Sequence, residues 1–420
     1  MTQSPGLRRV MGGFDATTVG VGAMIGAGAF VVFSPASASA GALLPLAVVI
    51  AGFVAYCNAA ATASLAVHYP SSGGTYLYGR ERLGPWPGFL AGWGFVTGKL
   101  ASCAAMALTF GLYAAPGAEK AAAVAAVVGL TVVNLLGVTR TALATRVIVA
   151  LVVPVLAFVV VVAFTAPAAP ATGSAAPGGV DGVLQAAALL FFAFAGYARI
   201  ATMGEEVRDP RRNIPRAIFG ALGFTLALYL LLALSLLHAL GPEALAASTA
   251  PLLDVVDAAA QPDGAAGVLD TVVVAAAALA SLGALLALIA GVGRTSLAMA
   301  RNRDLPPVLS RISTRFGVPW VADVTTAVVV VVLLLATDVL TVVGFSSFGV
   351  LVYYAIANVS AFTLSDRQWY APRWLNAVGA AACLVLAFTL PATSVLTMLG
   401  VLAAGVAVRF AVLARRRRRA

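Results

Sequence analysis

Residues 20–30 read GVGAMIGAGAF, with four glycines among the first nine positions of a long apolar stretch. Each glycine lowers the preference for helix by about 1 kcal/mol relative to alanine, so we expect a helix that breaks within this stretch. Gly22-x-x-x-Gly26 could instead be a helix-packing motif. A dinucleotide-binding fingerprint is excluded, because no strand–helix–strand context surrounds these glycines.

The chain around this stretch has the composition of a membrane protein. Of its 420 residues, 61% are hydrophobic and 10% are charged, whereas a soluble domain has about 25% charged residues. A helix of about 20 apolar residues crosses a bilayer core, and such stretches recur along the sequence. Twelve candidate spans begin near residues 13, 42, 86, 121, 143, 182, 215, 268, 320, 338, 374 and 393. We therefore expect an all-α polytopic membrane protein with one transmembrane domain over residues 1–420.

The basic residues give the orientation. They account for a net charge of +10 but lie in short clusters between apolar stretches, which indicates topology signals rather than a nucleic-acid-binding face. With the N-terminus inside, nearly all of them fall on the cytosolic side, as the positive-inside rule requires. We predict a multi-pass protein of the cytoplasmic membrane with both termini cytosolic. The basic tail at 415–420 would contact anionic membrane lipids.

A second stretch, FFAFAGYAR at residues 191–199, places one glycine among bulky aromatic side chains. Alone it is a weak signal for a helix break. If the first ten spans form two halves of five, however, this stretch and residues 20–30 occupy corresponding positions. Paired interrupted helices indicate a transporter's binding site, because amides near Ala27 and Gly28 can face a carboxylate while carbonyls near Met24 can face an ammonium group.

Three stretches resemble the amino acid/polyamine/organocation permease superfamily: Gly20–Phe30, Phe191–Ile218 and Gly293–Pro306. The most specific is GEEVRDPRRNIPR at residues 204–216. In RTSLAMARNRDLP, residues 294–306, Arg303-Asp304 replaces the family's usual Asp-Gly. The resemblance implies a LeuT-type 5+5 inverted repeat with interrupted helices 1 and 6. Core helices 1–10 would cover about 13–363, and peripheral helices 11 and 12 about 374–414.

The resemblance also implies secondary active transport of amino acids by alternating access, without a cofactor or metal. Carried over by position, the substrate contacts would be Met24, Ile25, Gly26, Ala27, Gly28, Phe192 and Ala195. Phe192 would be an aromatic gate, or else a packing residue. Ala198 stands where the family often has an acidic residue, with Arg199 next to it, so the family's usual coupling and specificity are not carried over to this chain.

The charges within the spans bear on substrate and coupling. No Asp or Glu lies in the middle of a predicted span, and an unpaired buried charge is costly. We therefore expect the substrate to be a neutral or an acidic amino acid rather than arginine, lysine or a polyamine. A cationic ligand could bind here only through cation–π contacts with aromatic side chains. No Ser or Thr lies between Ser281 and Thr295, which disfavours sodium coupling and favours proton symport.

Two cations inside the spans are candidates for coupling or gating. Lys99 could exchange a proton, replace a bound sodium ion, or simply snorkel or form a structural pair. Arg199 hardly deprotonates, so it would pair with carbonyl groups, with a carboxylate or with an acidic substrate.

The same composition and fold are compatible with functions other than amino acid uptake. An integral-membrane enzyme would need converging acids for metal and phosphate chemistry, and no such cluster appears, so we predict that the chain is not an enzyme. An amino acid exchanger or exporter, a polyamine permease and a non-transporting sensor of the same fold stay open.

Overall fold

The computed structural model describes residues 11–69, 73–137, 141–170, 177–202, 207–259 and 266–417. Within these ranges the regular structure is helical, and one isolated backbone bridge joins Met11 to Val207. The helices are α1 (Gly13–Met24), α2 (Ala27–Val31), α3 (Phe33–Ala40), η1 (Gly41–Leu43), α4 (Leu44–His68), α5 (Gly74–Leu83), α6 (Pro85–Ala114), α7 (Glu119–Leu135), α8 (Thr141–Thr165), α9 (Gly179–Phe194), η2 (Ala195–Tyr197), α10 (Ala198–Thr202), α11 (Pro210–Ala247), α12 (Pro251–Ala259), α13 (Ala266–Arg301), η3 (Pro307–Ser310), α14 (Trp320–Ala336), α15 (Val339–Phe362), α16 (Arg373–Thr389) and α17 (Ala392–Arg417).

The helix starts agree with the sequence analysis, since a helix begins at or within a few residues of each of the twelve predicted starts. Eight helical segments of the described chain are long and apolar enough to cross a membrane. Trp320–Ala336 and Arg373–Thr389 are shorter apolar helices. The chain is therefore an all-helical, multi-pass membrane protein, while the count of twelve crossings and the inverted repeat stay predictions.

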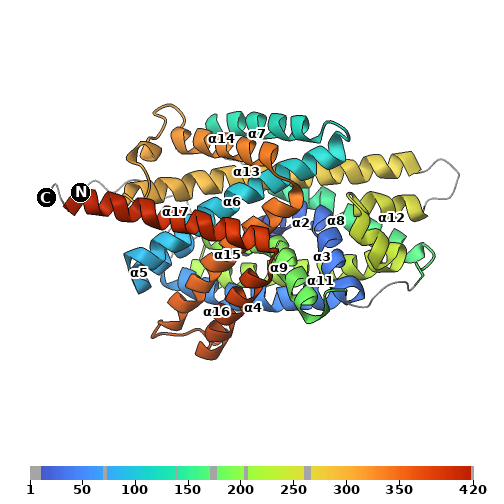
Figure 1. Ribbon diagram of the computed structural model, residues 1–420, viewed down its shortest axis with the longest axis horizontal. Helices are drawn as coiled ribbons and strands as arrows, with labels where there is room; N and C mark the ends of the chain where they lie inside the picture. The colour runs from blue at the N-terminus through green and yellow to red at the C-terminus, as the bar shows by residue number, and fades with distance from the viewer. Residues whose placement is uncertain are drawn as a thin grey trace.

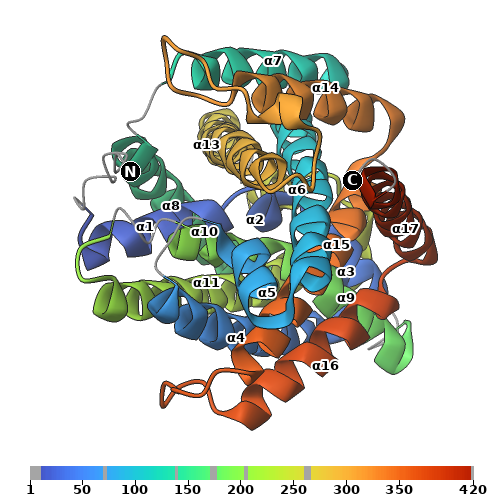
Figure 2. The same cartoon turned by 90° about the vertical axis from the view of Figure 1, so that its left-hand side faces the viewer.

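The helices form a bundle around α6 (Figures 1 and 2). On its sides α6 packs against α13 and α15, while α1 packs against α8 and α11, and α9 against α3 and α4. The pair α7 and α14 covers one flank of the bundle. Because α1, α6, α9 and α13 meet near the centre, residues far apart in the sequence lie together there.

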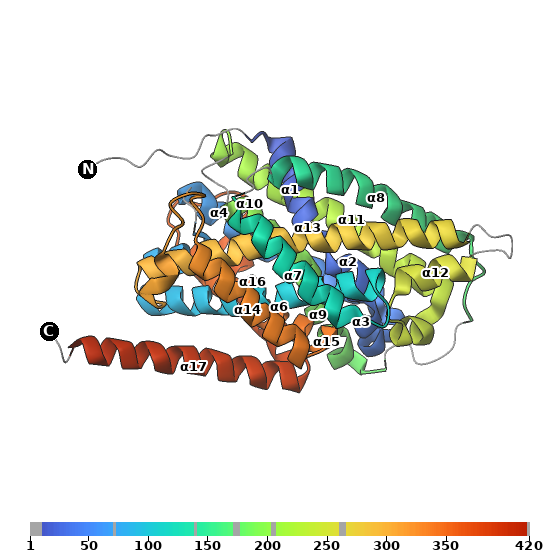
Figure 3. The same ribbon diagram turned by 90° about the horizontal axis from the view of Figure 1, so that it is seen from above.

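The outer surface of the bundle is apolar. Large hydrophobic side chains such as Val161 and Leu396 are 62% and 69% exposed, which a soluble monomer avoids over large contiguous areas. Figure 3 shows α17 lying along the outer edge, in keeping with its predicted peripheral place. This helix continues to Arg417, so part of the predicted basic tail is helical.

Several predicted features lie wholly or partly outside the described residues. These are Gly204–Glu206 of the 204–216 stretch, the N-terminal Arg8 and Arg9, and the end of the tail at 418–420.

One buried polar group ties α17 to the bundle. The carboxylate of Asp304, three residues after the end of α13, accepts hydrogen bonds from the Tyr76 hydroxyl at 2.8 Å and from Arg80 at 3.0 Å, both on α5. Arg409 of α17 forms an ion pair with it at 2.9 Å. The Arg409 guanidinium also lies 4.5 Å from the centre of the Phe89 ring. Burial and the bond to Asp304 raise the pKa of Tyr76, so its hydroxyl stays a donor.

Candidate functional site

The first break lies where the glycines of residues 20–30 predict it. Helix α1 ends at Met24, and α2 begins at Ala27. Between them Gly26 has φ and ψ of −140° and −140°, far from helical values. The Met24 carbonyl oxygen accepts hydrogen bonds from the Gly26 amide at 3.0 Å and from the Tyr229 hydroxyl of α11 at 2.8 Å. Protein groups therefore satisfy a carbonyl that lipid could not.

The second break is milder. Between α9 and α10 the chain tightens into the 3-10 turn Ala195–Tyr197. The Ala195 carbonyl accepts a hydrogen bond from the Tyr354 hydroxyl of α15 at 3.3 Å. Gly196 lies so close to α1 that a Cβ there would overlap the backbone of Ala23 and Met24. The two interrupted helices thus meet directly at their breaks.

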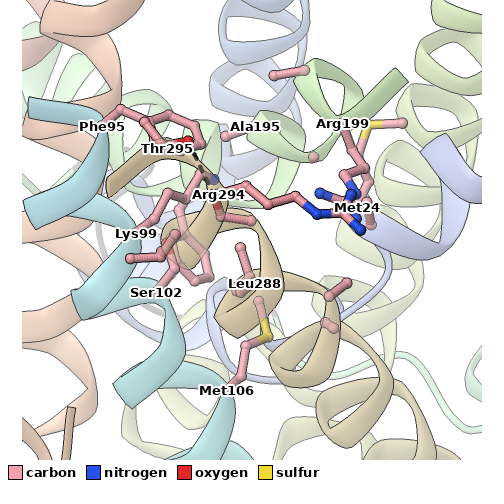
Figure 4. A pocket seen from close by; sticks show the side chains of 18 of the residues that line it. Met24, Phe95, Lys99, Ser102, Met106, Ala195, Arg199, Leu288, Arg294 and Thr295 are labelled. Carbon is pink, nitrogen blue, oxygen red and sulfur yellow. Dashed lines mark hydrogen bonds between the residues drawn. The ribbon is translucent and has the colours of Figure 1, made fainter. Parts of the chain in front are cut away.

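A cavity of about 370 Å³ opens beside these breaks. Its walls come from the end of α1, the start of α2, the middle of α6, the α9–α10 break and the second half of α13 (Figure 4). Most of the residues that line it have apolar or small side chains. The two interrupted helices, α6 and α13 thus share this cavity.

Four of the seven predicted substrate contacts line the cavity, namely Met24, Gly28, Phe192 and Ala195. All four lie beside the breaks, and their contact with a substrate stays a prediction.

The other three, Ile25, Gly26 and Ala27, are not part of the cavity wall. Ile25 is 2% exposed, and Gly26 packs against Met106 and Ala284. The Ala27 amide, expected to face a carboxylate, instead donates to Met106 Sδ at 3.0 Å. These residues lie behind the wall because α6 and α13 close over the break.

Met106 is a wall residue that sequence reasoning missed. Phe95, Lys99, Ser102 and Met106 all line the cavity from α6, and Figure 4 shows Lys99, Ser102 and Met106 on this wall. Steps of three and four residues place side chains on one helix face. Extending the face of Lys99 along the predicted helix would have found them.

Both predicted coupling residues also reach the cavity. Lys99 is buried, at 8% exposure, and lines the wall from α6, while Arg199 lines it from α10. The Arg199 guanidinium extends to α13, where a Cβ on Gly291 would lie 3.5 Å from Nη1. Lys99 therefore does not snorkel to a membrane surface.

Two further cations of α13, Arg294 and Arg301, complete a basic lining. The Arg199 and Arg294 side chains extend toward the same end of the cavity, near Met24 (Figure 4). Among the described residues no Asp or Glu lines this cavity. The cavity thus presents a positive field, which favours ligands with negatively charged groups.

Comparison with known proteins agrees with this architecture. The family model described as "Amino acid permease" matches residues 11–411. An uncharacterized transporter of Mycobacterium tuberculosis is 53% identical over 411 residues, covering 96% of this chain and 90% of its own. A chloroplastic cationic amino acid transporter of Arabidopsis thaliana is 29% identical and covers 88% and 68%. A branched-chain amino acid permease of Bacillus subtilis is 27% identical and covers 75% and 72%.

Proposed function

The chain belongs to the amino acid permease family of the amino acid/polyamine/organocation superfamily, and on this premise we propose that it carries amino acids across the cytoplasmic membrane by secondary active transport. The substrate would enter the cavity beside the two helix breaks and leave by alternating access. Family membership points to transport rather than catalysis. The basic segments between the spans support cytosolic termini.

The observation that carries the substrate assignment is the charge of the cavity wall. Lys99, Arg199 and Arg294 line it from three helices, and no carboxylate side chain lines it within the described part of the chain. A cationic side chain or a polyamine would be repelled here. The names of the relatives point in different directions, one to branched-chain and one to cationic substrates. The wall favours amino acids with neutral or acidic side chains.

We place the substrate's α-carboxylate at the start of α2. There the Ala27 amide donates to Met106 Sδ, and a thioether is a weak acceptor. A carboxylate is a stronger acceptor, so it would displace the sulfur when Met106 turns aside. Gly28 lies next along the wall, and Phe192 and Ala195 bound the same space from α9 and η2.

For coupling we propose protons, with Lys99 as a group that could carry one. Its ammonium is buried in the wall near the middle of α6, where the charge is costly. The loss of that proton would change the charge of the cavity during the transport cycle.

A thermal-shift screen of the detergent-purified protein tests this proposal. The ligands are all amino acids, several polyamines and nucleobases, because a ligand that binds the folded state raises its apparent stability. We expect stabilisation by neutral or acidic amino acids, followed by uptake of the same compounds in proteoliposomes. Selective stabilisation by arginine, lysine, polyamines or nucleobases would overturn the substrate assignment.

A further inference from the structure

A buried carboxylate lies just behind the cavity wall. Asp323, in the first turn of α14, is 0% exposed. It packs against Gly293 of α13 so closely that a Cβ on Gly293 would overlap Asp323 Oδ1. Both carboxylate oxygens are buried and lack a hydrogen-bond partner among the described residues. Gly293 lies between the wall residues Val292 and Arg294, so Asp323 sits behind the segment that forms one side of the cavity.

The next residue on α13 is the nearest source of a counter-charge. Arg294 interacts electrostatically with Asp323, although no ion pair joins these two described residues within 4.0 Å. Consecutive Cα atoms are about 3.8 Å apart, and Asp323 Oδ1 lies where a Cβ on Gly293 would be. The carboxylate is therefore within reach of an arginine side chain at 294. In this structure Arg294 extends along the cavity instead (Figure 4).

The other helices packed against α14 offer no better partner. The titratable groups of α7 are Glu119 and Lys120, and Lys120 Nζ donates to the Leu335 carbonyl at the opposite end of α14. On the neighbouring α6, Lys99 lines the cavity, and η3 contains no titratable residue. Among these groups, Arg294 is the charged one that directly follows the residue against which Asp323 packs.

A carboxylate in this position is costly when ionised and unpaired. Two arrangements remove that cost. Either the carboxyl group holds a proton, which leaves Arg294 in the cavity, or Arg294 turns back to pair with the carboxylate. Both arrangements use the same two residues. The protonation state of Asp323 therefore determines whether the Arg294 guanidinium lies in the cavity or beside the carboxylate.

We propose that Asp323 and Arg294 form a proton-controlled switch for the ligand's carboxylate, an inference that rests on the proposed transport function. When a proton binds Asp323, an O–H bond forms and Arg294 faces the cavity, where it attracts the anionic group of the ligand. When that proton leaves for water on the other side, the carboxylate draws Arg294 away and the ligand is released. Proton and ligand then favour each other's binding reciprocally, as symport requires.

The first test uses Asp323→Asn, which imitates the neutral carboxyl without a large change of shape. The probes are L-glutamate and L-leucine, representing acidic and neutral substrates, with binding measured at pH 5.5 and pH 8. For the probe that binds, we expect affinity in the unmodified protein to be about tenfold higher at the lower pH, within the usual range of coupling between two sites. In Asp323→Asn the pH dependence should disappear. Accumulation driven by a proton gradient in proteoliposomes should be lost, while counterflow exchange persists.

Two further variants are compared with Asp323→Asn. Arg294→Gln should bind the ligand at both pH values about as weakly as the unmodified protein does at pH 8, since it removes the group that the switch positions. Asp254→Asn, an exposed acid of α12, is the matched control and should accumulate substrate like the unmodified protein. Unchanged accumulation and pH dependence in Asp323→Asn would overturn the switch.

A second measurement needs no substrate. Infrared difference spectra of the unmodified protein between pH 5.5 and pH 8 should contain a buried carboxyl band, which Asp323→Asn removes. Absence of that band from the unmodified protein would refute protonation of Asp323. If no amino acid binds or is carried but the band is present, the proposed function fails and the titrating carboxyl stands.

Discussion

The Tyr229 hydroxyl donates a hydrogen bond to the Met24 carbonyl oxygen at 2.8 Å, at the residue where the first helix stops. The bond joins α11 to α1. The Tyr354 hydroxyl likewise donates to the Ala195 carbonyl in the second break. The Tyr113 hydroxyl donates to the Phe30 carbonyl, which lies just after the first break. Three tyrosine hydroxyls thus bind backbone carbonyls in and beside the interrupted helices.

Tyr229→Phe tests the first of these bonds. The ring keeps its packing, and the buried Met24 carbonyl loses the tyrosine donor but keeps the Gly26 amide, so we expect a loss of about 0.5–1.5 kcal/mol in stability. A lower melting temperature in detergent measures it. Tyr56→Phe, at a ring that is 39% exposed, is the control and should shift stability by less than about 0.5 kcal/mol. Equal melting temperatures for both variants would contradict the role given to Tyr229.

Gly196→Ala tests the contact between the two breaks. A Cβ there would overlap the Ala23 carbonyl, and backbone atoms cannot move aside as the end of a side chain can. We expect poor expression or a loss of ligand binding. The control is Gly223→Ala on α11, where no atom lies within 4 Å of the added Cβ, and where alanine should gain up to about 1 kcal/mol. Normal binding by Gly196→Ala would show that the breaks are not locked together.

Arg409→Gln tests the cluster that holds α17. The buried Asp304 carboxylate would lose one charged partner but keep Tyr76 and Arg80. We therefore expect a moderate loss of about 1.5–3 kcal/mol, the range for a hydrogen bond to a charged group. Thermal unfolding followed by tryptophan fluorescence measures it. The exposed Arg315, which stacks on Phe316, supplies the control Arg315→Gln, and an equal effect there would argue against a specific role for Arg409.

Lys99→Ala tests the proposed proton carrier. Proteoliposomes should lose accumulation driven by a proton gradient but retain substrate binding or exchange, because the cavity keeps its other contacts. Lys120→Ala removes an exposed lysine whose Nζ caps the end of α14, and it should leave accumulation unchanged. If Lys99→Ala accumulates substrate normally, Lys99 is a structural residue.

Much of this protein could be predicted from local sequence. Apolar length predicts membrane helices, because backbone groups in lipid must be satisfied within a helix, and the helix starts agree. The glycines of residues 20–30 predict the break at Ile25 and Gly26, because helix preference is a property of each residue and its neighbours. Lys99 and Arg199 are recognisable in the sequence as charged residues within apolar stretches, and both line the cavity.

The tertiary structure decided the rest, since it depends on how helices distant in sequence rotate and pack. In the sequence Asp323 is an acid near the start of a predicted span, and only the packing of α14 on α13 buries it against Gly293. Gly26 and Ala27 lie behind the wall because α6 brings Met106 over them. A sequence records that a residue can be charged or small. Only the contacts between helices determine which neighbour meets it, and therefore whether that charge is solvated, paired or left alone.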